Sequence, residues 1–275
     1  MSNVNLTILS TLSAMSSMNN LGHPTVSVII PCYNAEKFLE DAVLSALNQT
    51  YPVEQVICID DGPTDNTGHI LNRLSKKHAS ITVLSQDNQG PGSARNNGMQ
   101  CCSSDYVQFL DADDILLPKK IEHQIYLIKN SSKKPNIIIG SYIICNTHNN
   151  QYEEIIISVS SVWKNIVDIR MGTMCSNLFK RSALEDIGLF NRDTHVEDID
   201  LYVRLLKEDP SYAVDKLPLT IIRNHSDSRS KKKEPLQKSY ITLLGNLKSH
   251  LQKNNLRSSP DCCVIGVLPD LHIRW

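Results

Sequence analysis

The chain has 275 residues, of which 41% are hydrophobic, and this proportion is ordinary for a globular protein with a buried core, so a disordered or collagen-like chain is excluded. Its 28 basic and 29 acidic residues give a formal charge of -1. The strong basic excess typical of proteins that bind nucleic-acid phosphates is missing, and no nucleic-acid partner is expected.

Two features of the sequence indicate the cellular compartment of the protein. The eight cysteines occur singly or as adjacent pairs without C-x-x-C spacing, so we expect reduced thiols. Residues 1–24 contain an apolar patch at 6–12 but lack a basic start and a long apolar core, so neither a signal peptide nor a membrane span is predicted. Together these features predict a cytoplasmic protein.

Strands and helices are predicted to alternate over residues 25–118. The run VSVIIP at 26–31 is typical of a strand buried on both faces of a parallel sheet, and Asn34 is expected to cap the next helix. Then follow a strand at 53–59, a helix capped by Asp65, a strand at 81–84, a helix opening at 90–92 and a strand at 106–110. This alternation predicts a mostly parallel sheet whose ligands bind beyond the carboxyl ends of the strands.

The pattern is less regular after Pro118. We expect a helix near 119–129, β-structure at 137–144 and 155–159, and helices near 181–187 and 195–208. An apolar run at 217–222 precedes the segment RNHSDSRS. The tail from about residue 231 begins with three lysines and includes a plausible helix.

The acidic segment DADD, residues 111–114, directly follows the predicted strand at 106–110. If the chain is extended there, Asp111 and Asp113 point the same way and can serve one ligand. Carboxylates suit hard cations such as Mg²⁺ or Mn²⁺. A solvated acidic loop is the alternative, and the position at a strand end favours the metal site.

A second acidic pair, Asp60 and Asp61, ends the predicted strand at 53–59 within DDGPTDNT. An acid at this place in a nucleotide-binding sheet can accept hydrogen bonds from ribose hydroxyls or a base N–H. Turn chemistry alone explains Gly62 and Asp65 but leaves the two consecutive acids unexplained.

The segment THVEDIDLYVRLL has the form of an amphipathic helix. Thr194 and Glu197 have the spacing of a capping box, and one apolar face leaves Asp198 on another side near the helix start. The helix dipole there favours an ionised carboxylate, which is the state that a base needs. The alternative is an ordinary acid of the first turn.

Several segments together resemble the family 2 glycosyltransferases of GT-A fold: VSVIIPCYNAEKFLEDAVLSALNQTY, DDGPTDNT, NQGPGSARNNG and DYVQFLDADDILLP. They cover about residues 25–118, and CSNLFKRSALEDIGLFNRDTHVEDIDLYVRLL extends the resemblance to about 208. The resemblance implies an inverting transferase of polysaccharide biosynthesis that binds a nucleoside diphosphate sugar, a UDP-sugar by preference, and a divalent cation, Mn²⁺ or Mg²⁺. A glycan or lipid-linked acceptor is expected.

The resemblance also implies roles for individual residues. Asp198 is expected to be the general base, and Asp113 to ligate the cation together with His225 of the R-x-H pattern at 223–225. Expected contacts to the nucleotide sugar come from Pro31, Tyr33, Asp60, Asp61, Arg95 and Asp111. Two departures concern local geometry: Pro63 stands where the family usually has Ser, and Cys102-Ser103-Ser104 replaces A-x-G.

The fold implied is α/β: a GT-A, Rossmann-like, mostly parallel central sheet flanked by helices, with a smaller acceptor-side lobe. We expect an N-terminal tail at 1–24, a nucleotide-sugar-binding half at 25–118, an acceptor-binding half at 119–230 and a basic, helical tail at 231–275. The lysines at 231–233 form a solvated linker or a weak contact to anionic lipid at the inner face of the membrane.

Other functions leave different signatures. A nucleotidyltransferase usually has a Gly-rich, basic phosphate loop after the first strand, where this chain has PCYNAEKF. A NAD dehydrogenase is not expected because no G-x-G-x-x-G follows that strand. A non-catalytic nucleotide-sugar-binding scaffold of the same fold is the other alternative, and the presence of Asp198 argues against it.

Overall fold

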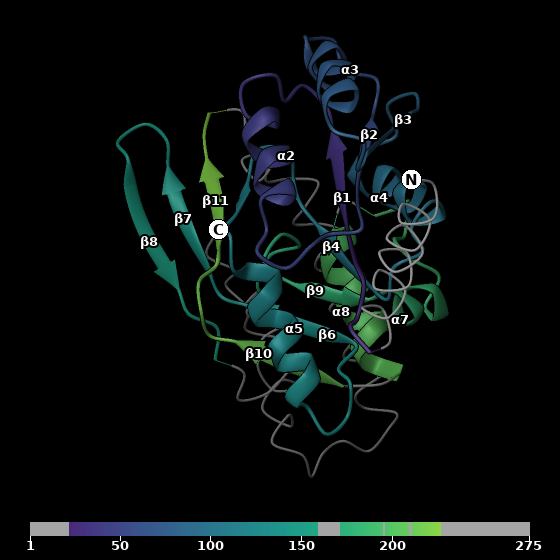
Figure 1. Cartoon of the computed structure of the whole chain (residues 1–275), viewed down its shortest axis with the longest axis vertical. Helices are drawn as coiled ribbons and strands as arrows, with labels where there is room; N and C mark the ends of the chain where they lie inside the picture. Colours follow the sequence, from purple (N-terminus) through teal and green to yellow (C-terminus); the bar gives the residue numbers. More distant parts are fainter. Residues whose placement is uncertain (1–21, 159–170, 195, 209–210, 227–275) are drawn as a thin grey trace, which may run out of the picture.

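The computed structural model of the chain describes residues 22–158, 171–194, 196–208 and 211–226 (Figure 1). Within them, two sheets lie side by side, one of seven strands and one of four. Among the described residues, no helix is both long and apolar enough to cross a membrane. The predicted tails at 1–24 and 231–275, with the lysines at 231–233, lie wholly or almost wholly outside the described residues.

The large sheet has the strand order β10-β6-β9-β4-β1-β2-β3. Its pairs are parallel except at β9, which runs antiparallel to both β4 and β6. The bounds are β1 Val26–Cys32, β2 Gln55–Asp60, β3 Ile81–Ser85, β4 Tyr106–Phe109, β6 Ile137–Gly140, β9 Leu178–Lys180 and β10 Tyr212–Asp215. The prediction of a mostly parallel α/β sheet is confirmed.

Helices cover both faces of this sheet because alternate side chains of each strand point to opposite sides. In β1, Ile29 packs in the cluster that includes α4, α7 and α8, whereas Val28 and Ile30 pack in the cluster that includes α2, α3 and α5. Figure 1 shows α2 and α5 in front of the sheet and α8 behind it. The helices span α2 Leu39–Leu47, α3 Thr67–Lys77, α4 Pro91–Gln100, α5 Lys120–Asn130, α7 Arg181–Asp186 and α8 Glu197–Glu208.

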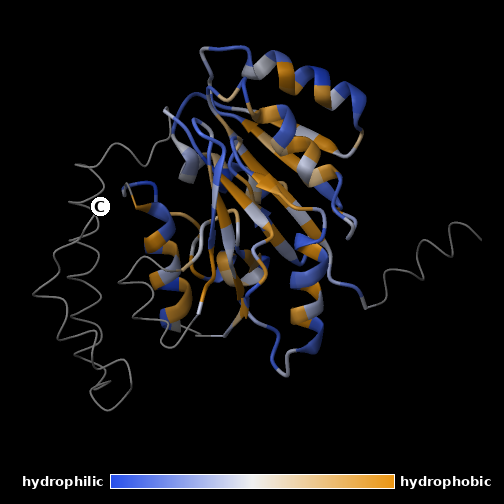
Figure 2. Cartoon of the chain, turned by 90° about the vertical axis from the view of Figure 1, so that its left-hand side faces the viewer, coloured by the Kyte–Doolittle hydropathy of each residue, from blue (hydrophilic) through white to orange (hydrophobic). Residues whose placement is uncertain are grey.

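The distribution of hydropathy agrees with this layering. The central strands are largely hydrophobic, whereas the covering helices carry hydrophilic residues on their outer sides (Figure 2). Val26, Ile29, Ile57 and Phe109 are all fully buried in the sheet. The apolar faces of the helices therefore close a core on each side of the sheet.

The small sheet has the order β5-β11-β7-β8 and lies beside the large one (Figure 1). It consists of β5 Ile115–Leu116, β7 Tyr142–Asn146, β8 Gln151–Ile155 and β11 Thr220–Asn224. β5 directly follows the acidic segment, and β11 pairs with both β5 and β7. This sheet therefore carries the end of β11 toward the acidic segment.

The two β-structure predictions in the second half have different outcomes. The β-structure predicted at 137–144 is confirmed, but it is divided into β6 and β7, which belong to different sheets and are separated by Ser141. The run predicted at 155–159 contributes only Ile155 to a strand, since β8 lies earlier, and residue 159 lies outside the described residues. Hydrophobicity identified these runs but could not show where the chain changes sheet.

The two predicted helix caps also differ. Asn34 lies well before the start of α2 with a φ of 48°, and its side chain bonds Thr64 instead of a helix N–H. Asp65 does serve the start of α3, because its Oδ1 accepts the N–H of Thr67 at 2.9 Å. The cap prediction is therefore wrong for Asn34 and confirmed for Asp65.

Candidate active site

Three parallel strands bring their carboxyl ends to one edge of the large sheet. Cys32 at the end of β1 pairs with Asp60 at the end of β2, and Ile29 pairs with Phe109 at the end of β4. The segments that follow these strands begin with Tyr33, Asp61 and Leu110. Topology thus gathers both predicted acidic clusters along one edge, where open α/β sheets bind ligands.

The two acids after β2 have different surroundings. The Asp61 side chain is 2% exposed and accepts hydrogen bonds from Gln86 Nε2 at 2.7 Å and from the N–H groups of Gln89 and Gly90 at 2.9 and 3.1 Å. Asp61 therefore holds the loop that leads into α4. Asp60 is half-buried, and burial raises its pKa, an effect that the Asp61 charge reinforces and the Gly62 N–H opposes.

The predicted donor-site residues of β1 lie at its end. Pro31 is half-buried within the strand, whereas the side chain of Tyr33, just beyond it, is 48% exposed. An exposed aromatic ring at a strand end offers a flat apolar surface to a ligand. Tyr33 and Asp60 therefore present one aromatic and one acidic side chain at neighbouring strand ends.

The acidic segment after β4 is a turn and not an extended chain, because the N–H of Asp114 donates to the carbonyl of Asp111 at 3.1 Å. The expectation that Asp111 and Asp113 alternate like strand residues is therefore wrong. Asp111 bonds Arg95 Nη2 at 2.7 Å, and Asp113 Oδ2 lies 2.9 Å from His225 Nε2. Asp114 is buried and accepts the N–H of Arg223 at 2.9 Å.

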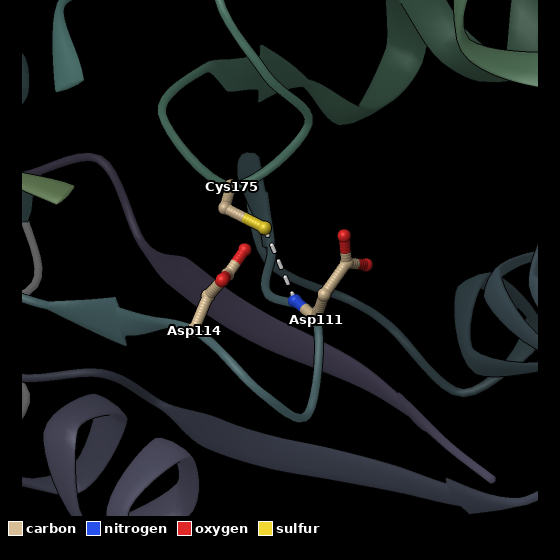
Figure 3. A group of neighbouring side chains, drawn as sticks. All are labelled: Asp111, Asp114 and Cys175. Atoms are coloured by element: carbon tan, nitrogen blue, oxygen red, sulfur yellow. Dashed lines mark hydrogen bonds between the residues drawn. The ribbon is translucent and has the colours of Figure 1, made fainter. Parts of the chain in front are cut away.

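Cys175 completes the surroundings of these acids. Its sulfur accepts the N–H of Asp111 at 3.2 Å, and ligand atoms of Asp111, Asp114 and Cys175 all lie within 4.8 Å of one another (Figure 3). Burial, and then the charges of Asp111 and Asp114, raise the pKa of the Cys175 thiol well above its usual range. Cys175 is therefore a protonated thiol and a hydrogen-bond acceptor in this setting.

The acids fit a hard divalent cation. Burial and then the Asp111 charge raise the pKa of Asp113, and burial together with Asp113 and Asp111 raises the pKa of Asp114 well above its usual range. Several carboxylates thus repel one another in a partly desolvated place, and a cation would relieve this repulsion. Oxygen ligands are those that Mg²⁺ and Mn²⁺ prefer, and His225 adds one imidazole nitrogen.

His225 lies where the sequence places it, after β11, and the structure brings it to Asp113. Its ring packs against Phe38 at a centroid distance of 4.9 Å, while the Arg223 guanidinium lies over the same Phe38 ring at 5.1 Å. Arg223 also pairs with Asp41 of α2 at 2.8 Å. The end of β11 is thus fastened to α2 and to the acidic turn.

Asp198 lies in the first turn of α8 and is half-buried. Its Oδ1 accepts the N–H of Ile199 at 2.8 Å. The dipole was expected to favour the ionised form, but burial and the neighbouring Glu197 charge raise the pKa of Asp198 despite the opposing charge of Arg95. A raised pKa makes a carboxylate a stronger base.

The predicted capping box at the start of α8 does not form as expected. The Thr194 hydroxyl accepts the N–H of Val196 at 3.2 Å, and Glu197 pairs with Arg95 Nη1 at 3.6 Å. The sequence assigned Glu197 only to the capping box, and it gave no separate role to Asp114 and none to Cys175, which the structure brings to Asp111. Cys175 stands 64 residues from Asp111, so no local pattern points to their contact.

Known proteins are similar to this chain in sequence and in fold. The family model of glycosyl transferase family 2 matches residues 27–188. An uncharacterised glycosyltransferase of Haemophilus influenzae is 32% identical over 187 residues, which are 67% of this chain and 73% of the relative. A Rickettsia felis relative is 31% identical over 78% of this chain, which spans 36% of that protein's length.

Two further similarities are to a named synthase and to a structure with a bound nucleotide sugar. A poly-β-1,6-N-acetyl-D-glucosamine synthase of Staphylococcus epidermidis is 31% identical over 63% of this chain and 44% of its own length. The structure of residues 1–349 of S. aureus TarS in complex with UDP-GlcNAc has a TM-score of 0.68 at 17% identity, and the similarity covers 82% of this chain and 66% of that TarS chain.

The mannosyltransferase PcManGT of Pyrobaculum calidifontis, in complex with GDP-Man and Mn²⁺, has a TM-score of 0.60 at 15% identity. It covers 90% of this chain and 74% of PcManGT. These structural similarities show the GT-A glycosyltransferase fold. Together with the family match over more than half of its length, they show that the chain belongs to glycosyl transferase family 2.

Proposed function

We propose that the protein is an inverting glycosyltransferase that moves a sugar from a nucleoside diphosphate sugar to a hydroxyl of a glycan or lipid-linked acceptor. One observation carries the proposal: the acids that end or follow β2 and β4 lie along one edge of the sheet, and Arg95 links Asp111 there to the start of α8. The TarS and PcManGT complexes with UDP-GlcNAc and GDP-Man support a nucleotide-sugar donor.

Each side chain then has a task in the proposed reaction. Tyr33 and Asp60 bind the nucleoside, and Asp113 with His225 would hold a divalent cation near Asp111. A cation bound there would supply positive charge to offset the charge of the leaving diphosphate. Asp198 accepts the proton of the acceptor hydroxyl as its oxygen attacks the anomeric carbon from the face opposite the diphosphate. The configuration inverts, and no covalent enzyme intermediate is needed.

The similarity to the poly-β-1,6-N-acetyl-D-glucosamine synthase of Staphylococcus epidermidis supports sugar transfer in polysaccharide biosynthesis as the broader role of this protein. A UDP-sugar is the proposed donor, in line with the TarS complex. We place the reaction in the cytoplasm, with weak contact of the lysines at 231–233 to the inner face of the membrane.

The first prediction tests donor and cation binding together. UDP-GlcNAc and GDP-mannose, each with Mn²⁺ or Mg²⁺, are added in thermal-shift measurements to the native chain and to Asp113→Ala. We expect at least one nucleotide sugar to raise the melting temperature of the native chain only with the cation, because Asp113 lies in the acidic turn with raised pKa. The variant should lose this cation-dependent shift.

Asp186→Ala is the matched control, because Asp186 is an exposed acid at the end of α7. It should respond like the native chain. Donor stabilisation without a cation, unchanged in Asp113→Ala, would contradict the proposed cation site. Donor binding without any release of nucleoside diphosphate, with or without Mn²⁺, would instead indicate a non-catalytic binding protein.

A further inference from the structure

Arg95 of α4 lies inside the protein, between the acidic turn and α8. Its side chain is 5% exposed, with Nη2 2.7 Å from Asp111 Oδ1 and Nη1 3.6 Å from Glu197 Oε1. Its guanidinium carbon also lies 5.4 Å from the centre of the Phe190 ring. Although burial lowers the pKa of Arg95, the charges of Asp111 and Glu197 raise it overall, so the guanidinium stays charged.

The helix that carries Arg95 is also fastened to the segment that leads into α8. Asn96 Nδ2 donates to the Phe190 carbonyl, and the Phe190 N–H donates to Asn96 Oδ1, both at 2.9 Å. A Cβ added at Gly92 would lie 3.5 Å from Glu197 Cγ, so α4 approaches the start of α8 closely. α4 thus contacts both the segment that leads into α8 and Glu197, the first residue of α8.

On the basis of the proposed function, we propose that Arg95 and Glu197 are positioning residues. Their buried ion pair fixes the first turn of α8, and with it Asp198, relative to Asp111. The resemblance had implied that Arg95 holds the donor. With its side chain almost fully buried and both carboxylate partners in place, Arg95 instead acts on the donor only through Asp111.

The physical basis is the cost of unpaired buried charge. Glu197 is 7% exposed, and a buried carboxylate is stabilised only if a cation or hydrogen-bond donors compensate its charge. A displacement of the first turn of α8 away from α4 would lengthen the contact between Glu197 and Arg95. Because Asp198 is the next residue in the same turn, the ion pair restrains the base through a single peptide unit.

The test uses the full chain with Glu197→Gln, Arg95→Met and the double variant. In Glu197→Gln we expect kcat to fall about tenfold or more, because a slightly displaced base loses its alignment with the acceptor. The KM for the nucleotide sugar identified by the thermal-shift screen, and the affinity for UDP with Mn²⁺, should stay within about twofold. Glu154→Gln is the control, since Glu154 is exposed on the edge strand β8, and should behave like the native chain.

A second readout does not require turnover. Hydrogen exchange of the amides at 198–203 in the unliganded protein should quicken about fivefold or more in both single variants, because local opening is easier without the ion pair. The amides of α5 report any general destabilisation and should change less. In the double variant, the effect of Glu197→Gln should be nearly absent, as expected for partners in one interaction.

The outcomes separate the two proposals. Faster exchange at the start of α8 without turnover on any nucleotide sugar would support the ion pair's positioning role and count against the proposed function. Turnover and exchange both unchanged in Glu197→Gln would overturn the positioning role. It would equally be overturned if Arg95→Met weakened UDP binding while Glu197→Gln changed nothing, because Arg95 would then act on the donor alone.

Discussion

Asp198 has the features that a general base requires: it is partly exposed, its carboxylate is held by a hydrogen bond, and its pKa is raised. We predict that Asp198→Asn binds UDP with Mn²⁺ almost normally but loses transfer by about a hundredfold or more, the scale of general base catalysis. Asn keeps the size of the side chain and cannot accept the proton. Isothermal titration and steady-state turnover measure the two effects, and full activity of Asp198→Asn would remove Asp198 from the mechanism.

At the residue scale, the sequence predicted acids but not their partners. Asp60, Asp61, Asp111 and Asp113 follow strands, and strand ends can be read from apolar runs. The division of labour between Asp60 and Asp61 depends on a loop 25 to 29 residues away, which no local pattern reveals. The unusual 102–104 segment proves harmless, since none of its residues is among the positive-φ residues of the described chain.

At the element scale, the first half of the chain follows its sequence pattern more closely than the second. Strands and helices at 25–110 alternate, and each predicted strand there becomes one strand of the large sheet. The run at 137–144 is divided between two sheets at Ser141, and the preceding Gly140 passes directly against the segment 171–177. The N–H of Gly140 donates to Asn177 Oδ1 at 2.9 Å there, and this contact between distant segments is not encoded in the hydrophobic period.

The close approach of the Gly140 and Ser176 backbones predicts the effect of a substitution at Gly140. A Cβ at Gly140 would lie 2.1 Å from the backbone oxygen of Ser176, so the two backbones must separate. We expect Gly140→Ala to lower the free energy of unfolding by about 1–3 kcal/mol, the usual cost of overpacking. Urea denaturation measures this change. Gly92→Ala, whose Cβ meets only ordinary contacts at 3.5 Å or more, is the control and should be neutral or stabilising.

If Gly140→Ala and Gly92→Ala had the same free energy of unfolding, the backbones of β6 and the segment 171–177 would have room for a Cβ between them. The same segment carries Cys175 to Asp111, so its displacement should also reduce donor-dependent thermal stabilisation. Stability and site geometry are therefore coupled at this element.

At the scale of the whole molecule, the composition predicted a globular protein, and the alternation of predicted strands and helices predicted its mostly parallel sheet. What the sequence could not show is how buried polar side chains join the two halves. Gln108, Gln124 and Lys120 donate to the carbonyls of the consecutive residues 175–177, at 2.7, 2.9 and 3.4 Å. Lys120 reads as an ordinary surface lysine in the sequence, yet its side chain is 1% exposed.

The buried Lys120 predicts how global stability depends on pH. Burial lowers its pKa from 10.5 to about 7, although the Asp215 carboxylate opposes the shift. Between these values the unfolded chain holds a proton that the folded chain lacks, so the Lys120 contribution to stability rises with pH. It is complete above about pH 10.5 and lost as the pH falls through about 7.

Lys120→Met removes the titrating amino group, and with it this pH dependence, while the new side chain is also unbranched and is apolar. The free energy of unfolding of the native chain, minus that of the variant, should therefore increase between about pH 7 and pH 10 by up to about 1.4 kcal/mol per pH unit. Urea denaturation at several pH values measures this difference. Lys119→Met, at an exposed neighbouring position, should show no such trend. Parallel pH profiles for the native chain and Lys120→Met would mean that Lys120 keeps its proton in the folded protein.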